Sequence, residues 1–173
     1  MSYSSDESSS SSFDESTLRG ELLNKKYLVI HRIGKGAFST VWLCHDIQNG
    51  KYYAIKIQYV DECNAGFYEI DILKKLKTTC KYINNLLDHF EHETNDGVHV
   101  CMVFELLAGS VYDIMKYGKY SKGLPENTAK SVTIQLLKAM DFITTKFNLL
   151  HTDIKPENML VVGISNRVQE IIN

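Results

Sequence analysis

The chain has 173 residues, of which 44% are apolar and 23% are charged, a composition typical of an ordinary folded domain. Its formal net charge of −2 gives no electrostatic reason to expect binding to nucleic acid or to acidic lipid. There is no run of about 18 apolar residues, so we expect no membrane-spanning helix, and the serine-rich start does not resemble a secretory signal. Cys44, Cys63, Cys80 and Cys101 form no C-x-x-C pair, which favours reduced thiols in an intracellular protein, cytoplasmic or nuclear.

Residues 1–17 contain nine serines, four acidic residues and no lysine or arginine. A segment with so little apolar surface cannot offset the entropy lost on ordering, so we predict a disordered tail. Ser4 and Ser12 each stand three positions before an acidic residue. Phosphorylation of the tail is therefore one interpretation, and a plain solvated segment is the other.

From Leu18 onward the chain has the pattern of a folded domain, with strands first and helices later. Apolar and aromatic periodicity predicts strands at 27–33, 40–45, 52–58 and 98–105 and a helix at 67–77. A long amphipathic helix is expected from Pro125 to Lys146, because apolar residues recur there at three- and four-residue steps.

Gly34 and Gly36 stand one residue apart between two predicted strands. A backbone that carries no side chains can lie close over a ligand phosphate, although such a pair is more often only a hairpin turn. A Rossmann dinucleotide site is excluded, because a strand follows the loop and Ser39 stands where a third glycine would be required.

Lys56 lies in an apolar predicted strand, where period-two alternation places it on the same face as Tyr52 and Ala54. A lysine there needs a partner, a ligand, or an edge position from which it reaches water. Glu69 lies in the apolar stripe of the helix at 67–77, so it needs a partner or a half-exposed position at the rim. A helix packed on the sheet would bring Lys56 and Glu69 together.

The segment from His151 to Leu160 carries the most specific pattern in the chain. Asp153 can accept a hydroxyl proton, Lys155 can neutralise phosphate charge, and Asn158 can hold a divalent ion. The chance of meeting these residue types at this spacing is on the order of one in 10⁵.

The glycine loop, strand lysine, helix glutamate and catalytic loop follow one another as in eukaryotic-type serine/threonine protein kinases, which the chain resembles over residues 22–160. The segments 36–43, 99–105 and 151–158 resemble the SR-protein kinases in particular, which phosphorylate serines in Arg/Ser-rich protein segments. Ser39 in place of a loop glycine and Thr152 in place of the usual arginine before the catalytic aspartate are part of that resemblance.

The resemblance implies an α+β, protein-kinase-like fold. Its expected parts are the tail at 1–17, a complete N-lobe to the hinge at 18–107, the start of the C-lobe with the catalytic loop at 108–162, and the start of a spacer at 163–173. The N-lobe should contain a five-stranded antiparallel sheet and one helix.

The resemblance also implies ATP and Mg²⁺ as cofactors and protein as the substrate. It makes Asp153 the catalytic base, places Lys155 at the transferring phosphoryl group, and makes Asn158 a ligand of Mg²⁺. The residues it assigns to ATP are Ile33, Gly34, Lys35, Gly36, Ala37, Phe38, Ser39, Val41, Ala54, Lys56, Glu69, Glu105, Leu107 and Leu160. Thr152 cannot pair with a phosphorylated activation loop, so activity independent of that phosphate is implied.

No D-F-G motif follows Asn158 in this sequence. We expect the chain to end inside a spacer that begins with a helix capped by Ser165. The aspartate of D-F-G holds Mg²⁺ in kinases, so we expect negligible phosphate transfer by these 173 residues alone.

Two alternatives of another kind stay open: a non-catalytic ATP-binding or interaction module, and one half of a split kinase completed by a second chain. A metal site built from His89, His92, His99 and Cys101 is disfavoured, because their spacing matches no standard zinc pattern.

Overall fold

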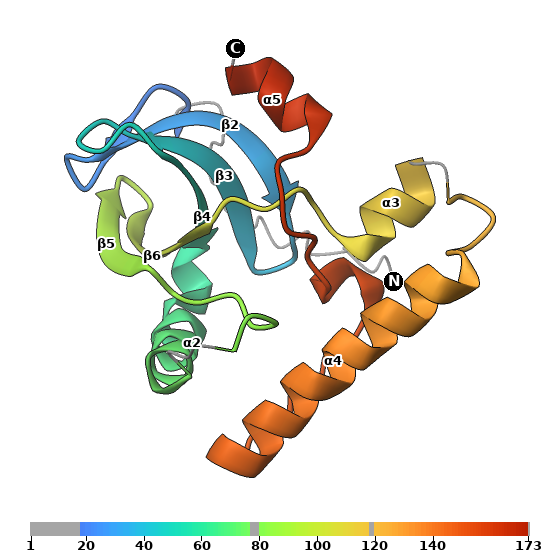
Figure 1. Ribbon diagram of the computed structural model, residues 1–173. Helices are drawn as coiled ribbons and strands as arrows, with labels where there is room; N and C mark the ends of the chain where they lie inside the picture. The colour runs from blue at the N-terminus through green and yellow to red at the C-terminus, as the bar shows by residue number, and fades with distance from the viewer. Residues whose placement is uncertain (1–17, 77–79, 118–119, 173) are drawn as a thin grey trace, which may run out of the picture.

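The computed structural model describes residues 18–76, 80–117 and 120–172. The predicted tail at 1–17 and its phosphorylation therefore lie outside the described residues. Within them, six strands form one antiparallel sheet in the order β1-β2-β3-β4-β6-β5 (Figure 1). The strands are β1 (Leu22–Leu23), β2 (Tyr27–Lys35), β3 (Ser39–Asp46), β4 (Tyr52–Gln58), β5 (Asp88–Thr94) and β6 (Gly97–Glu105).

The sheet has one strand more than the five expected. The additional strand is β1, in which Leu22 pairs with Leu28 and Leu23 pairs with Tyr27. A strand of two residues has no measurable periodicity, so the sequence pattern could not reveal it. The four predicted strands correspond to β2, β3, β4 and β6, with ends that differ by at most two residues.

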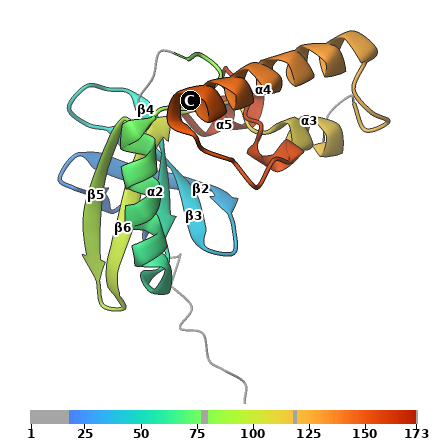
Figure 2. The same ribbon diagram turned by 90° about the horizontal axis from the view of Figure 1, so that it is seen from below.

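The helices are α2 (Cys63–Lys75), α3 (Val111–Tyr117), α4 (Glu126–Phe147) and α5 (Asn166–Ile172), with 3-10 turns η1 (Val60–Glu62) and η2 (Pro156–Asn158). The predicted helix at 67–77 begins four residues earlier, at Cys63, and 77–79 lie outside the described residues. Figure 2 shows α2 lying along one face of the sheet and α3 and α4 gathered at one end of the molecule.

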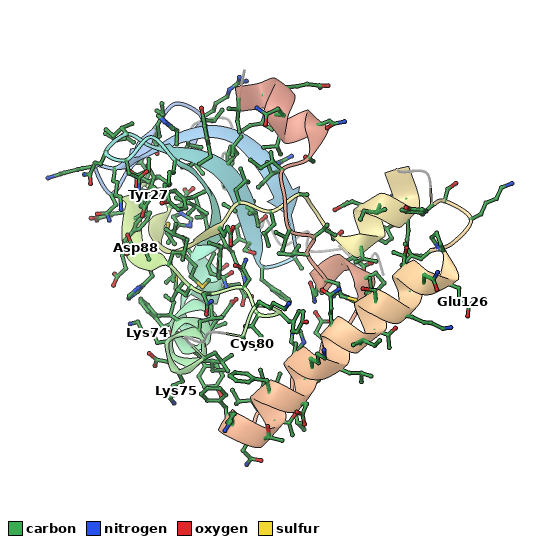
Figure 3. The ribbon with its side chains drawn as sticks, viewed as in Figure 1. Tyr27, Lys74, Lys75, Cys80, Asp88 and Glu126 are labelled. Carbon is green, nitrogen blue, oxygen red and sulfur yellow. The ribbon has the colours of Figure 1, made fainter. Side chains whose placement is uncertain are left out.

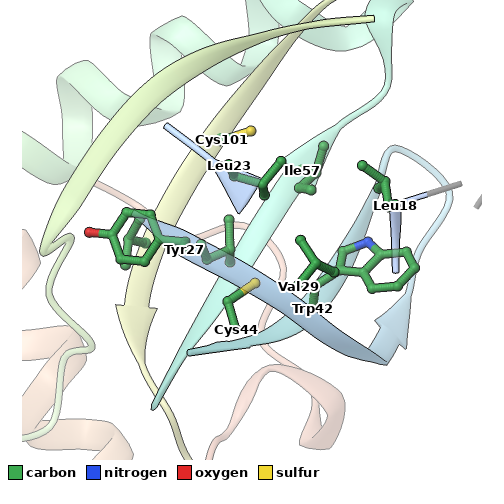
Figure 4. Packing of buried hydrophobic residues seen from close by; sticks show 10 residues of the cluster. Leu18, Leu23, Tyr27, Val29, Trp42, Cys44, Ile57 and Cys101 are labelled. Carbon is green, nitrogen blue, oxygen red and sulfur yellow. The ribbon is translucent and has the colours of Figure 1, made fainter. Parts of the chain in front are cut away.

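The sheet face opposite α2 carries the main hydrophobic core, which includes Val29, Trp42 and Cys44 (Figure 4). The Tyr27 ring stacks on Phe90 with ring centroids 5.7 Å apart. Its hydroxyl donates a hydrogen bond of 2.9 Å to Asp88 Oδ2, so Tyr27 of β2 and Asp88 of β5 point toward each other (Figure 3). These contacts bring together β2 and β5, which are not neighbours in the sheet.

On the other face, Ile70 of α2 packs on Val100 and Met102 of β6, and all three side chains are buried. This packing holds α2 against the sheet because burial of apolar surface is the main favourable contribution to folding. The side of α2 that carries Glu69 is thereby fixed relative to the central strands.

The chain leaves the sheet after β6 and later returns beside its own exit. Ala108 donates its backbone N–H to Val161 O at 2.9 Å, Val161 donates to Gly109 O at 2.9 Å, and Val111 donates to Met159 O at 2.8 Å. The segment after η2 is therefore hydrogen-bonded to the connection between β6 and α3.

Helix α5 begins after Ser165, as predicted, and the Val168 N–H donates to Ser165 Oγ at 3.3 Å. Its buried Val168 joins a cluster with Leu43 of β3 and with Leu106. Figure 1 accordingly shows α5 beside β2 and β3, at a distance from α3 and α4. The part of the chain predicted to open a spacer thus packs back on the sheet.

In α4 the predicted apolar stripe is half-buried or buried, with Ile143 only 7% exposed. Ile134 and Leu137 lie off that stripe and are 53% and 60% exposed. Helix α4 is followed by Asn148, whose left-handed backbone (φ 52°, ψ 41°) turns the chain toward the segment from His151 to Leu160.

Candidate active site

Lys56 and Glu69 form a close ion pair between β4 and α2. Lys56 Nζ lies 2.8 Å from Glu69 Oε1 and 2.7 Å from Oε2, so both carboxylate oxygens accept a hydrogen bond from the ammonium group. Strand β4 lies between β3 and β6, which excludes the interpretation of Lys56 as an edge residue. The structure therefore brings together the two charged residues for which the sequence predicted a mutual partner.

The glycine loop joins β2 to β3 and is closed by a hydrogen bond of 2.8 Å from the Gly36 N–H to Ser39 O. A Cβ atom added at Gly34 would lie 3.4 Å from Val41 Cβ, and one at Gly36 would lie 3.6 Å from Ser39 O. Both are ordinary contacts, and Gly36 does not have a positive φ angle. Neither packing nor backbone conformation therefore requires a glycine at position 36. The absence of a side chain there leaves space over the loop.

The predicted catalytic loop is held together by hydrogen bonds around Asp153. Its Oδ2 accepts from Asn158 Nδ2 at 2.8 Å and lies 2.9 Å from Lys155 Nζ. The hydrogen bond from Lys155, followed by that from Asn158, holds the pKa of Asp153 below its usual range. Thr152, immediately before it, has a left-handed backbone with φ of 57°. Asp153 is thus presented as an ionised carboxylate.

One cavity of about 460 Å³ brings these separate motifs together. It lies between the glycine loop, the ion pair and the catalytic loop. The residues that line it and that the sequence had already predicted as site residues are Gly36, Ala37, Phe38, Ser39, Lys56, Glu69, Asp153 and Lys155. Segments that are far apart in the sequence therefore face a common space that is lined by two lysines and three acidic residues.

The remaining predicted site residues do not line that cavity. Gly34 and Val41 pair across β2 and β3, and Ala54 packs against the cluster of Leu43, Leu106 and Val168. Leu160, which is 50% exposed, forms an isolated bridge with Ser110. The other predicted residues outside the lining are Ile33 and Lys35 in β2, Glu105 at the end of β6, Leu107 after it, and Asn158 in η2.

Three lining residues were missed from the sequence: Gln58, Glu62 and Ala65. Gln58 follows Lys56 by two positions in β4, so strand alternation alone would have placed it on the same face. Glu62 and Ala65 lie where η1 passes into α2, and the predicted start of that helix was too late to include them.

The disfavoured metal site finds no support in the part of the chain that the structure describes, where no group of three or more His, Cys, Asp or Glu residues could hold a metal ion. His99 is buried instead, with its Nδ1 2.8 Å from Gln58 O and its Nε2 3.1 Å from Thr94 Oγ1. The four cysteines, all within the described residues, are free thiols. Among those residues no helix is both long and apolar enough to cross a membrane.

Comparison with known proteins identifies the class to which this fold and site belong. The sequence model of the family described as protein kinase domain matches residues 27–170. The chain belongs to the protein kinase domain family. A crystal structure of a kinase domain superposes with a TM-score of 0.73 at 36% sequence identity, covering 84% of this chain and 42% of that one.

Similar curated proteins are named as protein kinases, some of them as serine/threonine-protein kinases and some as SRSF protein kinases. SRSF protein kinase 3 of Mus musculus is 38% identical over 82% of this chain and 26% of its own length. Protein kinase dsk1 of Schizosaccharomyces pombe is 35% identical over 87% of this chain and 29% of its own. A protein of Acanthamoeba polyphaga mimivirus, named as serine/threonine-protein kinase L205, is 36% identical over 92% of this chain and 30% of its own length. The chain therefore spans between about a quarter and a third of these relatives.

Proposed function

We propose that the chain forms the ATP-binding part and the catalytic loop of a serine/threonine protein kinase of SR-protein-kinase type. The reaction would transfer the γ-phosphoryl group of ATP to a serine or threonine hydroxyl of a protein substrate. The observation that supports this most strongly is the single cavity lined by Gly36, Lys56, Glu69, Asp153 and Lys155. These are the parts that phosphoryl transfer needs, since it depends on positioning and on stabilising negative charge.

In this proposal the backbone of the glycine loop, from Ile33 to Ser39, covers the phosphates of ATP. Lys56 supplies positive charge to the α- and β-phosphates while Glu69 fixes its direction. The space over Gly36 fits this role because a phosphate can approach backbone N–H groups only where no side chain intervenes.

The adenine ring would lie between Val41 and Ala54 on one side and Leu160 on the other. Glu105, Leu107 and the residue between them would then hydrogen-bond its edge through their backbone. The hydrogen bonds of Ala108 and Gly109 with Val161 support this placement, because they hold Leu160 close to the connection after β6.

Asp153 would act as the catalytic base. As the bond between the substrate oxygen and the γ-phosphorus forms, the bond from that phosphorus to the bridging oxygen of ADP breaks, and Asp153 takes the hydroxyl proton. A carboxylate whose pKa is held low by Lys155 is ionised at neutral pH and so can accept a hydrogen bond from that hydroxyl. Lys155 carries the complementary charge for the transferring phosphoryl group.

Asn158 would hold Mg²⁺ through its amide oxygen, because its Nδ2 is already occupied by hydrogen bonds to Asp153. An amide oxygen together with phosphate oxygens and water suits this hard cation, which neutralises phosphate charge when bound. The second metal-holding residue of kinases, the aspartate of D-F-G, does not occur in these 173 residues. We propose that it comes from outside this sequence, in the same polypeptide or in a second chain.

The proposed substrates are proteins with Arg/Ser-rich segments, and the proposed location is intracellular, cytoplasmic or nuclear. Both are supported by the similarity to SRSF protein kinases. The reduced state of Cys44, Cys63, Cys80 and Cys101 agrees with such a location.

The test is transfer of labelled phosphate from ATP to an Arg/Ser-rich peptide. The 173-residue chain is assayed alone and after mixing with a polypeptide that carries the D-F-G half of a related kinase. We expect transfer only in the mixture and its loss with Asp153→Asn. Nucleotide binding without transfer in the mixture would favour a non-catalytic ATP-binding module instead. Strong transfer by the chain alone would contradict the need for an added D-F-G.

A further inference from the structure

Gln58 is a buried polar residue beside the Lys56–Glu69 pair that none of the proposed roles uses. It is only 3% exposed and lines the same cavity. Its Nε2 donates a hydrogen bond of 3.3 Å to Glu69 Oε2, the oxygen that also accepts from Lys56 Nζ. Glu69 is therefore held from β4 by two donors, one charged and one neutral.

The side-chain carbonyl oxygen of Gln58 indicates why position 58 holds a glutamine and not an apolar residue. Gln58 Oε1 is buried, and no residue that the structure describes donates a hydrogen bond to it. An unpaired buried oxygen is unfavourable, and an apolar side chain of similar size would avoid it. The hydrogen bond that Gln58 Nε2 donates to Glu69 is the interaction that such a side chain would lose.

Gly66 of α2 provides the space that Gln58 occupies. A Cβ atom at Gly66 would lie 2.9 Å from Gln58 Cγ, which is closer than real contacts allow, and 3.1 Å from Val100 Cβ. Gly66 is buried in the interior of a helix, where glycine is among the least favourable residues. Here it allows α2 to approach β4 closely enough for Glu69 to reach both Gln58 and Lys56.

The backbone of Gln58 is also anchored. Its carbonyl oxygen accepts a hydrogen bond of 2.8 Å from Nδ1 of His99, which is 1% exposed. This bond links the end of β4 to β6, so the Gln58 side chain starts from a fixed point.

We infer that Gln58 is a positioning residue for Glu69 and that Gly66 makes this role possible. Together, Gln58 and Gly66 set α2 at the distance from β4 at which Glu69 orients Lys56. The ion pair itself is part of the structure, whereas its use in holding ATP rests on the proposed function.

A first experiment measures how strongly Glu69 protects Lys56 when no nucleotide is present. Lys56 is acylated with an amine-reactive reagent, and the rate is followed by mass spectrometry in the wild-type chain, in Gln58→Leu and in the control Gln48→Leu, which makes the same change at an exposed site. When Glu69 is released, Lys56 should react about fivefold faster, the factor that the loss of one modest hydrogen bond gives. An unchanged rate in Gln58→Leu would overturn the inference, whether or not the chain binds ATP.

A second experiment separates positioning from folding. Gln58→Leu should weaken MgATP binding about fivefold without lowering the melting temperature, because leucine removes the unpaired oxygen. In the Glu69→Gln background the same change should have no further effect on affinity. A fall in melting temperature with an equal loss of affinity in both backgrounds would show a merely structural role.

The space at Gly66 is tested by a compensating pair of changes. Gly66→Ala should lower both the melting temperature and the affinity, because the new methyl group displaces Gln58. Adding Gln58→Ala, which removes the Cγ atom that the methyl group would meet, should restore part of the melting temperature but not the affinity. Recovery of both would mean that Gln58 only fills space, which would contradict the inference.

Discussion

Lys56 in β4 and Glu69 in α2 meet with both carboxylate oxygens of Glu69 within 2.8 Å of Lys56 Nζ. This contact requires a definite distance between the helix and the sheet, which the packing of Ile70 on Val100 and Met102 maintains. The ion pair is only partly buried, with side-chain exposures of 27% and 36%. Its own contribution to stability is therefore expected to be small, and its value lies in directing Lys56 into the cavity.

Replacing Gly36 by alanine should separate ligand binding from folding. A Cβ atom there would make only an ordinary contact of 3.6 Å with Ser39 O, so we expect the melting temperature of Gly36→Ala to stay within about 2 °C of the wild-type value. The methyl group would occupy space proposed for a phosphate, so MgATP affinity should fall. A marked loss of stability, measured by thermal unfolding, would show that Gly36 has a structural role instead.

Helix α5 should contribute measurably to the stability of the sheet. Val168 is 7% exposed and packs against Leu43 and Leu106, so Val168→Ala should lower the free energy of unfolding by about 1–2 kcal/mol. Glu170→Ala, on an exposed position of the same helix, serves as the control and should have almost no effect. Equal small effects of both changes in urea unfolding would contradict the packing of α5 on the sheet.

The buried thiols should resist modification in the folded chain. Burial raises the pKa of the Cys44 thiol to about 12 and also raises that of Cys101. Alkylation at pH 8 should therefore leave both cysteines unmodified until the chain is unfolded, as judged by peptide mass spectrometry. Rapid labelling of Cys44 under native conditions would contradict its position in the core.

The raised pKa of Cys44 makes the stability of the fold depend on pH. The unfolded chain ionises Cys44 near the ordinary thiol pKa of about 9, whereas the folded chain does not ionise it until about pH 12. Stability from this thiol is therefore complete below pH 9 and is lost as the pH rises toward 12. Cys44→Ala should show a shallower alkaline loss of stability than the wild-type chain.

Asp153 should titrate below an ordinary aspartate, because Lys155 and Asn158 donate hydrogen bonds to its carboxylate. Because the pKa of Asp153 is lower in the folded chain than in the unfolded chain, its ionisation stabilises the fold at pH values above the pKa of the unfolded chain. This stabilisation is lost as the pH falls through the pKa of the folded chain. In Lys155→Met the pKa of Asp153 should move up toward the ordinary range, which carboxyl carbon chemical shifts can follow. No difference between the two chains would show that Lys155 does not hold this carboxylate.

The long, strongly periodic elements could be predicted from the sequence, whereas elements defined by their neighbours could not. Helix α4 was predicted to within one residue at each end because its apolar stripe covers many turns. Strand β5 contains only one apolar residue, Phe90, and was not assigned, since its identity depends on pairing with β6. The Ser165 cap indicated α5, but nothing local indicated that Val168 would pack on Leu43.

The candidate site shows the same division. The types and spacing of Asp153, Lys155 and Asn158 predicted a loop in which the three side chains meet, and the structure brings them together. The apolar surroundings of Lys56 and of Glu69 in the sequence predicted that each would need a charged partner, and the two form an ion pair. The role inferred for Gln58 could not be predicted, because it depends on Gly66 in a different element and on a distance that only the folded chain defines.

The most direct measurement of the central claim is MgATP binding to the 173-residue chain by calorimetry, compared with Lys56→Met and with the control Lys51→Met at an exposed position. We expect the wild-type chain and the control to bind one nucleotide with similar affinity and Lys56→Met to lose at least about tenfold in affinity, because phosphate charge is then left without its ammonium partner. No binding by the correctly folded wild-type chain, or equal binding by all three chains, would contradict the proposed nucleotide site.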